Sequence, residues 1–74
     1  MTALPVVTPR QLIRALERAG FFLHHATGSH RYYRHPGKPG LVVVPYHARD
    51  LKRGTLKSIL RQAGLSVDEL IQLL

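Results

Sequence analysis

Apolar residues recur at helical spacing near the start of the chain. One stripe holds Leu12, Ile13, Leu16 and Ala19, and mostly charged residues fill the positions between them. Thr8 is a typical helix cap, Pro9 suits the first helical position, and the Gln11 side chain can close a capping box. With Gly20 as a stop signal, the pattern predicts a helix over residues 9 to about 19.

The next part of the chain changes to short segments rich in aromatic and β-branched residues. These segments cover residues 21–25, 30–35 and 41–46, and turn-forming residues separate them at 26–28 and 36–40. We therefore predict three strands in an antiparallel meander. Pro45 has no backbone N–H for a sheet ladder, so we expect it to end the third strand or to lie on an edge.

Helical spacing returns after residue 51. Leu56, Ile59, Leu60 and Ala63 share one side, and Gly64 is a stop signal. Residues 66–69 form a second capping box before a short last helix. The predicted order is α-β-β-β-α-α, a three-stranded antiparallel sheet with helices on one face. This is an α+β fold whose other sheet face stays open to solvent or a ligand.

Side chains alternate along a strand, so the second strand presents different residues to its two faces. One set is His30, Tyr32 and Arg34, and the other set is Arg31, Tyr33 and His35. Hydrophobicity alone leaves the choice open. We expect the inward-facing residues of the sheet region to be Phe21, Leu23, Tyr33, Val42 and Val44. That choice leaves the His30 set on the open face.

The charge of the chain indicates a polyanionic partner. Eleven Lys and Arg against four Asp and Glu give a net charge of +7 and a pI near 10.9. We expect one domain over residues 1–74, and with no cysteine it has neither disulfides nor a Cys-based zinc site. No apolar run approaches the roughly 20 residues that span a bilayer, and residues 1–10 lack a basic segment followed by an apolar one. We therefore expect a cytoplasmic protein.

Histidine is the residue type that offers chemistry here. The five histidines lack zinc-ligand spacing and acidic residues are few, so no metal site is predicted. An imidazole can take the proton of an RNA 2′-hydroxyl near neutral pH, and His30, which follows Gly28 and Ser29, is the candidate. On the residues alone, a second interpretation stays open: His30 begins a strand after a turn and is simply solvated.

Residues around His30 suit nucleic acid. Gly28 would let a phosphate approach the backbone closely, and Ser29 offers a hydroxyl and an amide. Arg31, Arg34 and Lys38 could supply positive charge, and Tyr32 could stack on a base. The helix after residue 51 adds a basic ridge, which we define as Arg53, Lys57 and Arg61, spaced four apart.

Three segments together resemble the HicA family of toxins from bacterial toxin-antitoxin modules. They are "LIRALERAGF", "GSHRYYRHP" and "VVVPYHARDLKRGTLKSILRQAGLS", and the likeness runs from about residue 8 to residue 74. The resemblance implies a fold like that of double-stranded-RNA-binding domains. It also implies a metal-independent, cofactor-free ribonuclease that cleaves mRNA and is held inactive by a HicB antitoxin.

The resemblance assigns roles to individual residues. The catalytic histidine of the family falls on His30, with Gly28 and Ser29 completing its motif, whereas His35 and His47 take a structural or substrate-supporting role. Two features depart from the family pattern: an N-terminal extension over residues 1–7, and Phe22 at a position that is often polar. An exposed Phe22 would form an apolar patch with Tyr32, Leu41 and Val43, of the kind that marks a binding surface.

Two further functions remain as alternatives. The same fold could hold double-stranded RNA by shape and phosphate contacts without cleaving it. The helix after residue 51 could also act as a DNA recognition helix, although nothing pairs with it in helix-turn-helix spacing.

Overall fold

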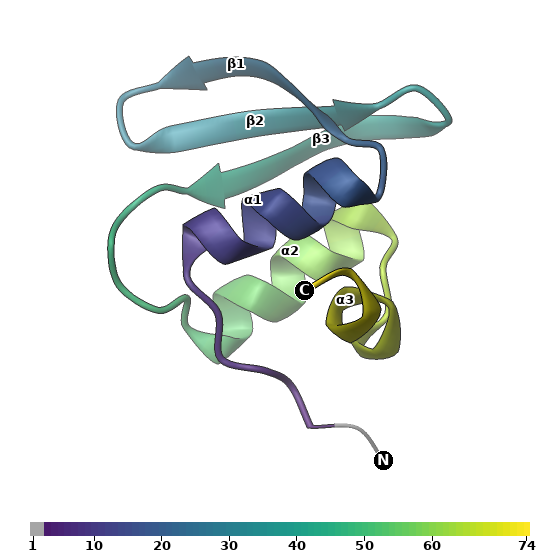
Figure 1. Cartoon of the computed structure of the whole chain (residues 1–74). Coiled ribbons are helices and arrows are strands. Elements are labelled where there is room, and N and C mark those ends of the chain that lie inside the picture. Colours follow the sequence, from purple (N-terminus) through teal and green to yellow (C-terminus); the bar gives the residue numbers. More distant parts are fainter. Residues whose placement is uncertain (1–2) are drawn as a thin grey trace.

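The computed structural model of the protein describes residues 3–74, and it has the predicted α-β-β-β-α-α order (Figure 1). The elements are α1 (Pro9–Arg18), β1 (Phe22–Thr27), β2 (His30–His35), β3 (Lys38–Pro45), α2 (Arg53–Ala63) and α3 (Val67–Leu73). The strands form one antiparallel sheet in the order β1-β2-β3. The protein therefore has the α+β layout of a double-stranded-RNA-binding-domain-like fold.

Helix α1 begins as its capping signals predict. The Gln11 backbone N–H donates to Thr8 Oγ1 at 3.3 Å, and the Thr8 backbone N–H donates to Gln11 Oε1 at 2.9 Å. This reciprocal pair satisfies two donors that a helix start leaves unpaired. The helix ends at Arg18, one residue before the predicted end, and Gly20 follows with a φ of +98°.

The strand boundaries differ from the predicted ones because pairing continues into residues that look like turns. Ala26 pairs with Arg31 and Thr27 pairs with His30, so β1 extends to Thr27. The β1–β2 turn is therefore Gly28–Ser29, and not residues 26–28. Strand β3 begins at Lys38 rather than residue 41, because Lys38 pairs with His35 across a short turn. It ends at Pro45, one residue before the predicted bound at residue 46, and so bears out the expectation that Pro45 ends the strand or lies on an edge.

One hydrophobic core joins the inner face of the sheet to the helices. Its main members are Phe21, Tyr33, Val42 and Val44 from the sheet region, and Leu12, Leu16, Leu56, Ile59, Leu60, Ala63 and Leu70 from the helices. Residues 1 and 2 of the predicted N-terminal extension lie outside the described residues. Within the rest, Val7 is buried and its carbonyl accepts a hydrogen bond from Leu51 N–H at 2.8 Å.

The helices cover only part of the sheet. Helices α1 and α2 pack against β3, and β1 is the strand farthest from them (Figure 1). Every residue of β1 is exposed. Leu23 pairs with the buried Tyr33 and so lies on the predicted inner face, yet it is 49% exposed. The prediction that Leu23 belongs to the core was therefore wrong. No helix lies over that strand to bury it, whereas the other four predicted inward residues are buried.

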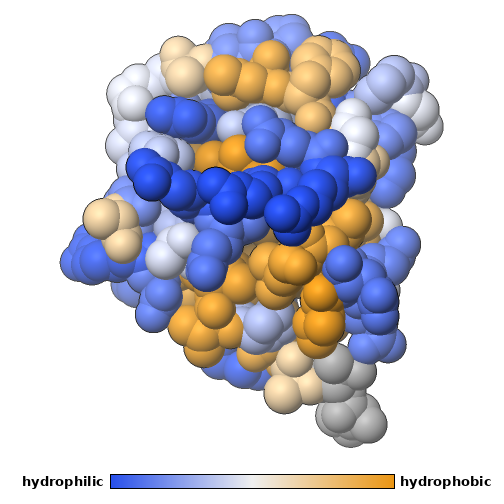
Figure 2. Space-filling view, viewed as in Figure 1, coloured by the Kyte–Doolittle hydropathy of each residue, from blue (hydrophilic) through white to orange (hydrophobic). Residues whose placement is uncertain are grey.

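Several large apolar side chains lie outside the core, and two of them belong to the predicted apolar patch. Phe22 is 49% and Leu41 is 37% exposed, so the expectation of an exposed Phe22 is confirmed. Hydrophobic atoms gather at the β1 end of the molecule in Figure 2, above a hydrophilic band that crosses α1. The exposed residues of α1 are Arg10, Gln11, Arg14, Glu17 and Arg18.

Candidate functional site

A two-residue turn presents His30 at the start of β2. Gly28 has a φ of +54°, a conformation that glycine adopts without steric cost. A two-residue hairpin turn requires a positive φ at its first residue, which is Gly28 here. A Cβ built on Gly28 would meet no atom within 4 Å, so the space beside the turn is open. The Tyr46 backbone N–H donates to the Ser29 carbonyl at 2.6 Å and ties the turn to the chain after β3. The backbone around His30 is therefore held from both sides.

The His30 side chain lies exposed on the face of the sheet that the helices leave open. It alternates with the buried Tyr33 and shares its face with Tyr32 and Arg34, as predicted. Among residues 3–74, no side chain or backbone group forms a hydrogen bond with its imidazole. Both ring nitrogens of His30 are therefore available to an incoming ligand.

A second pair of histidines lies on β1, where sequence reasoning assigned no role. The β1–β2 register shifts between Leu23 and His25, and the resulting bulge accommodates His24. The next residue, His25, pairs with Tyr32. The rings of His25 and Tyr32 stack at 4.2 Å and 8°. The Nδ1 atoms of His24 and His25 are 2.7 Å apart, and the Tyr32 hydroxyl lies 3.5 Å from Thr27 Oγ1. The open face thus carries a histidine pair beside the His30 end of the hairpin.

The sequence shows that His24 and His25 are adjacent, but the contact between their rings depends on the bulge. In a regular strand His24 and His25 would point to opposite faces. A bulge depends on the pairing of two strands, which the local pattern does not specify.

Arg31 belongs to a separate cluster on the other face of the sheet. Its guanidinium lies 3.7 Å from the centroid of the Tyr46 ring. A hydrogen bond from Arg10 and its positive charge lower the pKa of the Tyr46 hydroxyl. The cluster of Arg10, Arg31 and Tyr46 therefore combines two cations and one aromatic ring, and the sequence indicated only Arg31.

Lys38 lies at the opposite end of the sheet from His30. Its ammonium donates to the Ala63 carbonyl at 2.8 Å and lies 5.7 Å from the centroid of the Phe21 ring. This contact satisfies a carbonyl at the end of α2 and places a cation at the negative end of the helix. Lys38 therefore holds α2 to the sheet.

The basic ridge of Arg53, Lys57 and Arg61 is exposed on α2. The opposite side of this helix packs on β3, and Gln62 Oε1 accepts a hydrogen bond from Val43 N–H at 3.0 Å. The structure therefore divides the predicted nucleic-acid residues. Tyr32 and Arg34 share the His30 face, whereas Arg31, Lys38 and the basic ridge do not.

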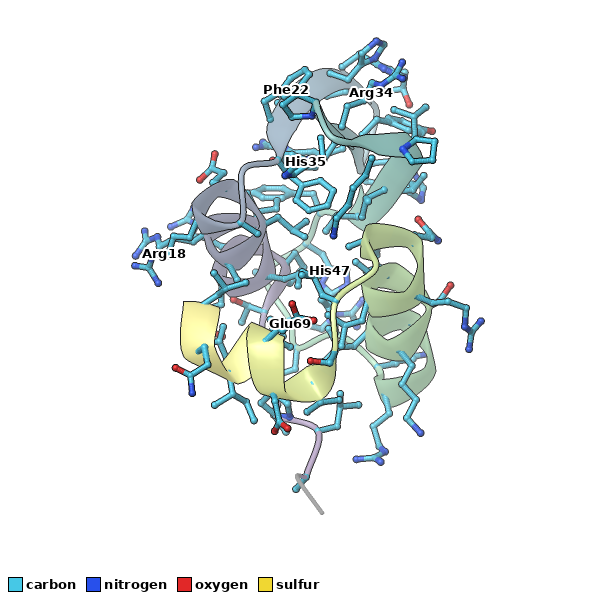
Figure 3. All side chains as sticks on the ribbon, turned by 90° about the vertical axis from the view of Figure 1, so that its right-hand side faces the viewer. Arg18, Phe22, Arg34, His35, His47 and Glu69 are labelled. Atoms are coloured by element: carbon cyan, nitrogen blue, oxygen red, sulfur yellow. The ribbon has the colours of Figure 1, made fainter. Side chains whose placement is uncertain are left out.

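His35 is fixed between the sheet and α1. The Gly37 backbone N–H donates to Nδ1 at 2.9 Å, and Nε2 lies 3.1 Å from the Ala19 carbonyl. Because Nδ1 accepts, Nε2 carries the proton and donates to that carbonyl. The ring also meets Phe21 edge-on at 5.0 Å. Figure 3 shows His35 between sheet and helices, whereas Phe22 and Arg34 lie at the outer end.

The remaining histidine, His47, is exposed after β3, and its Nδ1 accepts the Arg49 backbone N–H at 3.1 Å. It shapes the loop that leads to α2. Within residues 3–74, histidine and carboxylate side chains form no group of three or more that could hold a metal ion. Over the same residues, none of the helices has the length and apolar character to cross a membrane.

A known protein family matches the part of the chain that contains α1, the sheet and α2. The sequence model described as the HicA toxin of bacterial toxin-antitoxin systems matches residues 9–65, from the start of α1 to just past α2. A search of curated protein sequences gives no match. The matched segment includes the whole sheet, the Gly28–Ser29 turn and His30. The chain belongs to the HicA toxin family of bacterial toxin-antitoxin systems.

Proposed function

We propose that this HicA-family toxin is an endoribonuclease that cleaves mRNA by acid–base catalysis at His30, without a metal ion. The observation that carries the proposal is the state of the His30 imidazole. It is exposed on the open sheet face, and within residues 3–74 neither ring nitrogen has a hydrogen-bond partner. A group that must take up or release a proton needs such a free nitrogen.

RNA itself supplies the nucleophile for this reaction. When a base removes the proton of the 2′-hydroxyl, the oxygen can attack the adjacent phosphorus and break the backbone. Gly28 leaves open space beside the turn, which supports the approach of a phosphate close to the backbone. Ser29 supports the turn, Arg34 supplies positive charge on the same face, and Tyr32 offers a ring for stacking.

The cations away from the open face have a second role in this proposal. The basic ridge on α2, Arg31 with its neighbour Arg10, and the net charge of +7 attract the RNA backbone over a distance comparable with the screening length. This attraction does not require contact with the scissile phosphate. It predicts that RNA affinity falls steeply as salt concentration rises.

The proposal includes a HicB-type antitoxin as partner and the cytoplasm as the place of action. Membership of a toxin-antitoxin family supports a neutralising partner. The exposed Phe22 and Leu41, together with the half-buried Tyr32 and Val43, offer such a partner an apolar contact at the open face.

The test uses purified protein and labelled mRNA in excess EDTA. Wild-type protein is compared with His30→Ala, and with His47→Ala as a matched loss of an exposed histidine. We expect cleavage by the wild type and by His47→Ala, and none by His30→Ala. Cleavage by His30→Ala, or complete inhibition by EDTA, contradicts the mechanism. RNA binding without cleavage by the wild type would indicate the alternative function, a non-catalytic double-stranded-RNA-binding module.

A further inference from the structure

The proposed reaction needs two proton-transfer groups. The attacking 2′-oxygen must lose a proton, and the departing 5′-oxygen must gain one, while the two oxygens lie roughly in line through phosphorus. His30 supplies one group. We propose that His25 supplies the other, as the general acid that protonates the leaving oxygen, with His30 as the base. This inference rests on the proposed ribonuclease function.

The sheet register brings the two histidines to one face. Thr27 pairs with His30, and two residues earlier His25 pairs with Tyr32. Side chains of directly paired residues share a face, so His25 and His30 are diagonal neighbours on the open side. Diagonal neighbours lie about 7–8 Å apart. That figure describes the backbone positions, and imidazoles carried by residues so placed can reach oxygens on opposite sides of one phosphate.

The contacts of His25 suit a proton donor. Its Nδ1 lies 2.7 Å from Nδ1 of His24, and a hydrogen bond between these atoms contains one proton. When His25 is the imidazolium, it donates Nδ1–H to a neutral His24 and keeps Nε2–H for the substrate. The parallel stack on Tyr32, at 4.2 Å and 8°, fixes the plane of the donor ring. In this arrangement His24 is a positioning residue.

The step balances without a further reactant. A ring nitrogen of His30 takes the proton of the 2′-hydroxyl as the bond from the 2′-oxygen to phosphorus forms. The bond from phosphorus to the 5′-oxygen breaks, and that oxygen takes the Nε2 proton of His25. The products are a 2′,3′-cyclic phosphate and a free 5′-hydroxyl. Exchange with water then returns the two imidazoles to their starting states.

Tyr32 is the competing proton donor on this face. Its hydroxyl points toward Thr27, which pairs with His30. An imidazole exchanges its proton near neutral pH and a phenol as a class does not, so His25 is the better acid. The variant Tyr32→Phe separates the two, because it keeps the ring that stacks on His25 and removes the hydroxyl.

The experiment compares two leaving groups. An RNA whose cleavage position has been mapped is prepared with the normal 5′-oxygen and with sulfur in its place. A thiolate leaves without being protonated, so the sulfur substrate does not need the general acid. Single-turnover rates in excess EDTA are measured for the wild type, His25→Ala, His25→Phe, His30→Ala and Tyr32→Phe. His25→Phe keeps the stack on Tyr32 but has no proton to give, and circular dichroism verifies that each variant is folded.

The expected pattern is specific to the role of each residue. Both His25 variants should cleave normal RNA about 100 to 10,000 times more slowly than the wild type, and the sulfur substrate at close to the wild-type rate. His30→Ala should be slow on both substrates. Tyr32→Phe should change the rate by the same factor on both substrates, because its hydroxyl does not protonate the leaving oxygen. Equal losses on both substrates for the His25 variants, or rescue by sulfur of Tyr32→Phe instead, would overturn the assignment. Wild-type protein that cleaves neither RNA would remove the proposed function itself.

Discussion

The two ends of β2 carry the same residue type in opposite situations. His30 at the first position is exposed, and among residues 3–74 its ring has no hydrogen-bond partner. His35 at the last position accepts from Gly37 N–H, donates to the Ala19 carbonyl and packs edge-on against Phe21. His35 lies five positions after His30, and an odd offset along a strand puts the two side chains on opposite faces. One ring therefore meets the helical layer and the other does not. The surroundings of a histidine, rather than its presence in a motif, decide between a structural and a chemical role.

The largest expected effect is that of His30→Ala, which should remove toxicity but not RNA binding. We expect His30→Ala to abolish growth arrest when expressed without a partner, while RNA affinity by fluorescence anisotropy stays within a few-fold of wild type. Loss of one acid–base group typically costs about 100 to 10,000 in rate, whereas an exposed, unpartnered side chain contributes little to affinity. Growth arrest by His30→Ala would indicate that the toxin acts without this imidazole.

At the other end of β2, a change at His35 should lower the stability of the protein. His35→Ala removes a donor and an acceptor, and leaves the Gly37 N–H and the Ala19 carbonyl without their partner. We expect the free energy of unfolding to fall by about 1–3 kcal/mol, measured by urea denaturation. An unfolding free energy equal to that of the wild type would show that these two hydrogen bonds do not hold the ring in solution.

Two glycines test the backbone that presents His30. Neither Gly28 nor Gly54 has an atom within 4 Å of a built Cβ, but Gly28 has a φ of +54° and Gly54 lies in α2. Gly28→Ala should destabilise the protein by about 1 kcal/mol because the turn needs the left-handed conformation. Gly54→Ala should stabilise it by about 0.5–1 kcal/mol because alanine favours a helix. Equal shifts in urea denaturation would contradict this account of the turn.

The smallest expected effect concerns two tyrosines on the His35 face of the sheet. Burial raises the pKa of Tyr33 above its usual 10.0, whereas the hydrogen bond from Arg10 lowers the pKa of Tyr46 below it. Tyr46 therefore contributes stability that is present at pH above 10 and lost as the pH falls through its folded-state pKa. The contribution of Tyr33 is present below pH 10 and lost as the pH rises through its folded-state pKa.

The chain has three tyrosines, so an ultraviolet titration of phenolate formation in a Tyr32→Phe background measures these two alone. In that background, the Tyr46 hydroxyl should ionise early and the Tyr33 hydroxyl late. Arg10→Gln should move the early transition to higher pH and leave the late one in place. An unchanged early transition would show that Arg10 does not contact the Tyr46 hydroxyl in solution.

Local signals predicted most of the fold. The capping boxes at Thr8 and Ser66 and the stop at Gly64 act within a few residues, so the helix boundaries could be inferred closely from the sequence. The exposure of Leu23 could not be inferred in this way, because it depends on how far the helices extend across the sheet. The contact of Lys38 with the Ala63 carbonyl links residues 25 apart and gave no local signal.

The candidate site was predictable only in part. Alternation placed His30, Tyr32 and Arg34 on one face, and the family motif drew attention to His30. His25 joined them through a bulge that depends on the pairing of β1 with β2.

The most direct measurement compares the two histidines of β2 in one assay. Single-turnover cleavage of labelled RNA in excess EDTA is measured for wild type, His30→Ala and His35→Ala, and each rate is divided by the folded fraction. We expect the cleavage rate to fall by a factor of about 100 to 10,000 for His30→Ala, and to stay within a few-fold of the wild-type rate for His35→Ala. A His30→Ala protein that cleaves as fast as His35→Ala would contradict it.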